Sequence, residues 1–215
     1  MIWIVFAGLG AAAGALLPQA AERMAAWKME KKGKTLESAP AYTAPLTRAL
    51  CIASNALGWG LGAYFGSIAA ALLAAALWSC GVVLILLDLR LRIIPNELLL
   101  AMLVLGLPLQ VLQQDFGGLP RAVFSMLVIM MVYMVLGNFM GLYKIGAGDV
   151  KLSAVMALVL GYPYIMWAML AMALSMLLFC GVGIALRKMT LKSMLPFGPF
   201  LVPGFWVGVV LLLAA

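Results

Sequence analysis

Long apolar runs separated by short polar turns make up most of the chain. A run of about 18 or more apolar residues is long enough to cross the hydrocarbon core of a bilayer as a helix. The run at 150–163 is shorter than this, and the run at 44–64 is interrupted by Asn55 and by glycines. The pattern predicts an all-α, polytopic membrane protein with about eight transmembrane helices, near residues 2–21, 44–64, 67–88, 97–114, 121–141, 150–163, 164–186 and 196–214.

The composition agrees with this pattern. Hydrophobic residues make up 67% of the chain and charged residues 10%, whereas soluble domains are about half apolar and about a quarter charged. A soluble bundle is disfavoured, because too few polar side chains are present to cover its surface. We expect one membrane-embedded domain over residues 1–215, with a short basic cytoplasmic loop at 22–43 within it. The first run is expected to be a retained span, since basic residues follow it instead of preceding it as in a signal peptide.

The basic residues are distributed unequally between the two sides of the predicted helix array. Thirteen of the fourteen lysines and arginines fall in alternate connections, which lie on one side, and Arg121 alone falls on the other. Connections rich in Lys and Arg are retained in the cytoplasm. This side is therefore predicted to be cytoplasmic, with both termini on the opposite side. Contact with anionic lipids is expected as well, whereas no basic module with interleaved aromatic residues suggests nucleic-acid binding.

The chain contains no histidine, and this excludes several classes of enzyme. Nucleophiles activated by histidine and the HExxH zinc helix cannot be built without it. The three cysteines, Cys51, Cys80 and Cys180, are far apart and form no CxxC pair, so no thiolate metal site is predicted.

Two acidic residues stand at the ends of predicted spans. Asp88 ends the third span and Asp149 begins the sixth, which places both at the same predicted membrane face. Each could simply be an interfacial acid paired with a base, as Asp88 could be with Arg92 four residues later. Two carboxyl groups close together can instead share one proton, activate a water and protonate a leaving amine. We therefore predict that Asp88 and Asp149 are a catalytic pair.

The residues around Asp149 suit an approaching substrate. Gly146 and Gly148 carry no side chain, so a substrate backbone can come close to the carboxyl group. Lys151 either faces lipid phosphates or helps to hold an anion near the pair. Gly146, Gly148 and Lys151 are the predicted substrate-binding residues.

These motifs resemble those of a known family. The stretches "DLRLRIIPN" and "GAGDVKL" are similar to the paired signatures of the type IV prepilin peptidases, which are GxGD aspartyl proteases. "PFGPFLVPG" resembles the motif of that family's last span, and "GLGAAAGALLPQAAERM" that of its first, except that Pro18 stands where asparagine is usual. The resemblance implies an aspartic endopeptidase of the bacterial inner membrane, with Asp88 and Asp149 as the catalytic residues. Its substrates would be type IV prepilins or the pseudopilins of type II secretion, from which it removes a short basic leader at the cytoplasmic face.

The resemblance leaves a second activity open. Many members also methylate the new N-terminus with S-adenosylmethionine, and these usually carry an insertion with two CxxC pairs that this chain lacks. No cofactor is expected for proteolysis. Besides the prepilin substrate and membrane lipids no partner is predicted, and the oligomeric state stays open. The alternatives are a non-enzymatic transporter or assembly factor, disfavoured because both acids lie at span ends, and a presenilin-like GxGD protease, disfavoured by the order of the motifs.

Overall fold

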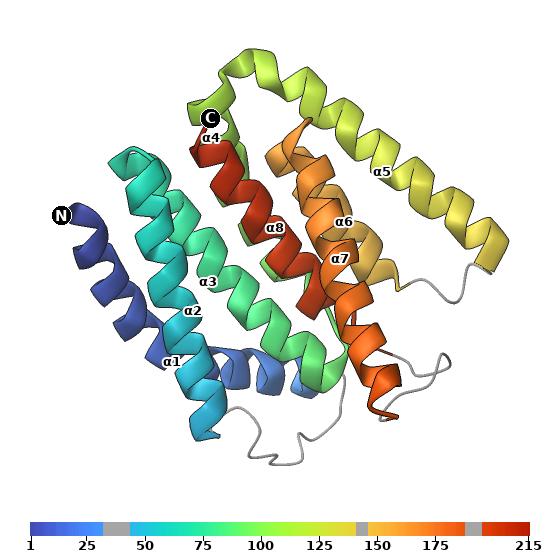
Figure 1. Ribbon diagram of the computed structural model, residues 1–215, viewed down its shortest axis with the longest axis horizontal. Coiled ribbons are helices and arrows are strands. Elements are labelled where there is room, and N and C mark those ends of the chain that lie inside the picture. The colour runs from blue at the N-terminus through green and yellow to red at the C-terminus, as the bar shows by residue number, and fades with distance from the viewer. Residues whose placement is uncertain (32–43, 141–145, 188–194) are drawn as a thin grey trace.

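The protein is a bundle of helices (Figure 1). The computed structural model describes residues 1–31, 44–140, 146–187 and 195–215, and these ranges contain no strand, so the predicted all-α class is confirmed. The elements are α1 (Ile2–Lys31), α2 (Pro45–Phe65), α3 (Ile68–Leu91), α4 (Asn96–Gln114), the 3-10 turn η2 (Phe116–Gly118), α5 (Leu119–Met140), α6 (Ala147–Leu160), α7 (Tyr164–Ala185) and α8 (Gly198–Leu213).

Several of these helices are long and apolar enough to cross a membrane. Within the described ranges five segments meet both conditions, Ile2–Lys31, Ile68–Leu91, Asn96–Gln114, Phe116–Leu136 and Tyr164–Ala185, and Gly198–Leu213 is a shorter apolar helix. Helix α6 has 14 residues and at 1.5 Å per residue covers about 21 Å, less than a hydrocarbon core of about 30 Å. The chain is thus a multi-pass helical membrane protein, and α6 reaches only part of the way across.

Helix α1 extends beyond the predicted span at 2–21. It continues through Pro18 to Lys31, and its second part lies across the lower end of the bundle (Figure 1). A proline inside a helix removes one backbone hydrogen bond and bends the helix. The Lys28 ammonium lies 2.6 Å from the Glu97 carboxylate at the start of α4. The first part of the predicted loop at 22–43 is therefore helical, and its residues 32–43 lie outside the described residues.

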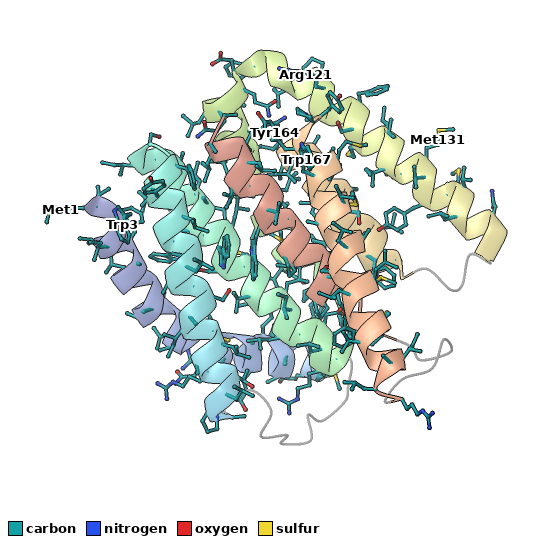
Figure 2. All side chains as sticks on the ribbon, viewed as in Figure 1. Met1, Trp3, Arg121, Met131, Tyr164 and Trp167 are labelled. Atoms are coloured by element: carbon teal, nitrogen blue, oxygen red, sulfur yellow. The ribbon has the colours of Figure 1, made fainter. Side chains whose placement is uncertain are left out.

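Helix α3 forms the centre of the bundle. Its buried side chains run along its whole length and include Ala70, Ala74, Leu77, Leu84 and Leu87. A helix that is apolar on all sides is typical of a buried position. Helices α5 and α7 instead direct large apolar side chains outward, among them Met131 and Trp167 (Figure 2), as lipid contact allows.

Polar side chains join α2 to α3 within the bundle. Asn55, which interrupts the second apolar run, is fully buried, and its amide donates to the Ser79 hydroxyl at 3.2 Å. The indole of Trp59 donates to the same hydroxyl at 3.1 Å, and that of Trp78 donates to Ser54 at 3.1 Å. Hydrogen bonds between membrane helices satisfy polar groups that lipid cannot. The asparagine is therefore compatible with a position inside the membrane protein.

Candidate active site

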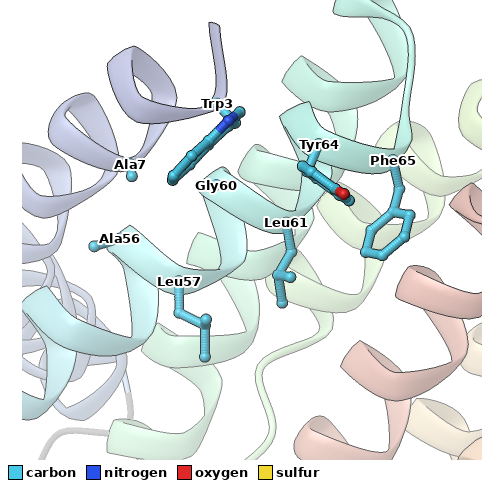
Figure 3. Close-up of a pocket in the computed structure, with 8 residues that line it drawn as sticks. All are labelled: Trp3, Ala7, Ala56, Leu57, Gly60, Leu61, Tyr64 and Phe65. Atoms are coloured by element: carbon cyan, nitrogen blue, oxygen red, sulfur yellow. The ribbon is translucent and has the colours of Figure 1, made fainter. Parts of the chain in front are cut away.

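Of three concave surfaces, two are almost wholly apolar and one has polar walls. A groove of about 510 Å³ lies between α1 and α2 and is almost wholly apolar; Figure 3 shows Trp3, Leu57 and Tyr64 along it. A second groove, of about 480 Å³, is also almost wholly apolar and lies between the first half of α5 and the start of α7. A smaller cavity of about 350 Å³ has polar walls and contains Asp88 and Asp149. Of these three surfaces among the described residues, this cavity is the one lined by carboxyl groups.

The polar cavity forms where the ends of three helices meet, at the membrane face predicted to be cytoplasmic. Its walls come from the end of α3 and the turn after it, from the start of α6 and from the segment before α8, with residues 88, 92–94, 146–149 and 195–197 lining it. The two aspartates are distant in sequence, and the fold places both on this cavity. Their catalytic role stays a prediction that this placement supports.

Helix α3 ends at Leu91, one turn after Asp88, because the backbone reverses at Arg92. Arg92 caps the helix in the left-handed conformation, with φ of 51°, and its N–H donates to the Asp88 carbonyl oxygen at 2.9 Å. Pro95 then precedes α4 in an extended conformation, which a proline favours. The Asp88 side chain is only 5% exposed, and its Oδ2 accepts a hydrogen bond from the Gly198 N–H at 2.8 Å. Asp88 is thus held by a donor from the last helix.

Helix α6 begins with the glycine motif. Gly146 is its N-cap, and the Asp149 N–H donates to the Gly146 carbonyl oxygen at 3.0 Å. Asp149 therefore lies in the first turn of the helix, where the positive end of the helix dipole favours an acidic side chain.

The two glycines of the motif lie in closely packed surroundings. A Cβ atom on Gly146 would lie 2.5 Å from Asp149 Oδ2, and one on Gly148 would lie 3.0 Å from the Cβ of Ile94. Both glycines line the cavity. The space beside them is thus already occupied by protein atoms, which explains the glycines structurally, and their predicted contact with substrate stays a prediction.

Lys151 lies apart from these residues. Its side chain is exposed and donates to the Asn96 amide oxygen at 3.2 Å, and it is not among the residues that line the cavity. It therefore joins the start of α6 to the start of α4. Substrate binding by Lys151 stays a prediction, and the structure adds no contact that favours it.

Two other residues near the pair, Tyr133 and Ser153, were not singled out from the sequence, whereas Arg92 was named there as a possible partner of Asp88. Arg92 lines the same cavity as the two acids. The Tyr133 hydroxyl on α5 lies 2.9 Å from the Ser153 hydroxyl, which is fully buried on α6 one turn after Asp149. A polar residue four positions after Asp149 was a usable signal, because such residues share one helix face. Among the described residues no cluster of three His, Cys, Asp or Glu side chains occurs.

These features define a multi-pass helical membrane protein with an acidic cavity at the ends of its spans. A family model described as the type IV leader peptidase family matches residues 73–185, slightly more than half of the chain. The chain therefore belongs to the type IV leader peptidase family, as the sequence resemblance indicated. The matched region includes Asp88 and Asp149 but not the first and last helices. No curated protein and no solved structure matches the chain.

Proposed function

We propose that this protein is an aspartic endopeptidase that removes the leader from type IV prepilins or pseudopilins. The observation that carries the proposal is the presence of Asp88 and Asp149 in one cavity, within a chain of a leader peptidase family. No histidine is available for another hydrolytic mechanism. A carboxyl pair performs hydrolysis without a nucleophilic side chain or a metal.

The proposed reaction uses one carboxylate and one carboxylic acid. The carboxylate takes a proton from a water held between the two groups, and the water oxygen attacks the carbonyl carbon of the scissile peptide bond. The other carboxyl group donates its proton to the peptide nitrogen, and the carbon–nitrogen bond breaks. The products are a carboxylic acid and an amine, and one net water is consumed. The pair again holds one proton, so the next turnover can begin.

The proposed setting is the cytoplasmic face of a bacterial inner membrane. The connections that carry thirteen of fourteen basic residues are expected to lie on that side. The substrate's basic leader would reach the cavity there, and anionic lipid would gather both proteins at the surface.

Whether the protein also methylates the processed N-terminus with S-adenosylmethionine is left open by the family resemblance. Incubation of the purified protein with a prepilin and labelled S-adenosylmethionine measures it directly, through label in the processed product.

Substitution of each aspartate tests the proposed protease. Asp88→Asn and Asp149→Asn keep the side-chain size and remove the ionisable group, so each should lower cleavage of a purified prepilin by about 10²–10⁴-fold. The product is measured by its size and N-terminal sequence. Asp115→Asn is the matched control, because Asp115 is exposed in the turn between α4 and α5, and it should cleave as the wild type does. Full cleavage by either active-site variant would disprove the carboxyl-pair mechanism.

A further inference from the structure

The amide at the start of α8 has an unusual acceptor. The first N–H groups of a helix have no carbonyl acceptor within the helix. In α8 the first residue is Gly198, whose N–H donates to Asp88 Oδ2 at 2.8 Å. The next residue, Pro199, has no N–H, and the Phe200 N–H donates to the Phe197 carbonyl oxygen at 3.0 Å. The Gly198 N–H is therefore the amide among these three residues that donates to another helix, and its acceptor is a buried carboxyl group.

This contact depends on the absence of a side chain at position 198. A Cβ atom there would lie 2.8 Å from Asp88 Oδ2 and 3.1 Å from the Cβ and Cγ atoms of the same residue. The Asp88 side chain is short and 5% exposed, so it has little space to move aside. Any other residue at 198 would displace the carboxyl group from its present position.

The packing of α3 against α8 sets the register of this contact. The Trp78 and Trp206 rings stack with centroids 4.3 Å apart and planes at 3°. Further along, a Cβ on Gly81 would lie 2.7 Å from Val202 Cγ1, so the helices touch closely there as well. Trp78, Gly81 and Asp88 follow one another along α3 and meet α8 in the reverse order of its sequence. The antiparallel packing of α3 and α8 therefore places Gly198 beside Asp88.

We propose that Gly198 is a positioning residue: its N–H holds the Asp88 carboxyl group in the orientation needed for attack by water. This inference rests on the proposed function. Gly198 does not act on the substrate itself, so its loss should slow the chemical step and leave substrate binding intact. Misplacing a reacting group by about 1 Å can lower a rate by about a hundredfold.

Kinetics of Gly198→Ala provide the first test. With a purified prepilin we expect kcat to fall by about a hundredfold and KM to stay at the wild-type value. Gly181→Ala is the matched control, because no atom lies within 4 Å of a Cβ placed on this glycine of α7, and its kcat and KM should equal those of the wild type. A wild-type kcat in Gly198→Ala would overturn the inference.

A stability cycle tests the same contact without relying on activity. Gly198→Ala is introduced into the Asp88 protein and into the Asp88→Ala variant, and thermal unfolding of all four proteins is followed in detergent. The added methyl group meets the carboxyl group, so it should lower the unfolding temperature clearly with Asp88 and less with alanine at 88. Equal losses in the two backgrounds would overturn the inference even if kcat fell. Absence of cleavage by the wild type would instead contradict the proposed function, and the cycle would still decide whether position 198 lies against the Asp88 carboxyl group.

Discussion

At the scale of single residues, three glycines, which carry no side chain, shape the candidate site. Gly146 and Gly148 come from the start of α6 and Gly198 from the start of α8, and a Cβ atom on any of them would press on Asp149, Ile94 or Asp88. Three glycines from two segments thus let two acidic side chains share a small cavity. The sequence predicted Gly146 and Gly148 as substrate-binding residues, and this stays a prediction. The structure adds that a Cβ atom at either position would lie close to Asp149 or Ile94.

A hydrogen bond one turn beyond Asp149 should contribute to stability. Tyr133→Phe removes the bond between Tyr133 and Ser153 and leaves a buried hydroxyl with one partner fewer. Interhelical hydrogen bonds in membrane proteins contribute about 0.6 kcal/mol on average, so the free energy of unfolding should fall by about that amount. Tyr162→Phe is the control, because this tyrosine is 58% exposed, and it should change little. Equal effects of the two substitutions would argue against the bond.

At the scale of elements, α1 has two parts with different roles. Its first part packs closely on α2, where a Cβ on Gly14 would lie 2.6 Å from the Cys51 carbonyl oxygen. Its second part follows Pro18 across the end of the bundle, buries Ala21 and Ala25 in the core and is joined to α4 by the Lys28–Glu97 ion pair. The hydrophobic pattern predicted only the first part as a membrane span, because charged residues end the apolar run while the helix continues.

Close packing of α1 on α2 leads to a prediction with a matched control. Gly14→Ala forces the two helices apart at a backbone atom, and overpacking of this kind costs about 1–3 kcal/mol. Gly8→Ala lies on the same helix with nothing within 4 Å of the added atom. It should be neutral or stabilise by up to about 1 kcal/mol, because alanine favours helix over glycine. Chemical denaturation in mixed micelles measures both, and a Gly14→Ala protein as stable as Gly8→Ala would contradict this packing.

At the scale of the whole molecule, the two termini and the acidic cavity lie toward opposite ends of the bundle (Figure 1). The distribution of basic residues predicts that the cavity end is cytoplasmic. The same asymmetry predicts that both termini lie on the far side of the membrane.

Orientation is therefore testable with reporters fused to this chain. A reporter active only outside the cytoplasm should be active at the C-terminus and inactive when inserted after Lys34, in the basic connection between α1 and α2. The opposite pattern would show that the cavity faces the other side. Replacing Arg121, the basic residue on the outer side, with glutamine should leave the pattern unchanged, because it adds no charge to that side.

The sequence by itself determined the class of protein, which follows from the length of the apolar runs. It also singled out Asp88 and Asp149 as candidates, because ionisable residues are scarce. It also indicated the family. Only the tertiary structure decided three features. Helix α1 continues along the end of the bundle, the Lys151 ammonium donates to Asn96, and the Gly198 N–H donates to Asp88. These depend on the relative register of helices far apart in the chain, which side-chain packing sets and which periodicity within one helix does not contain.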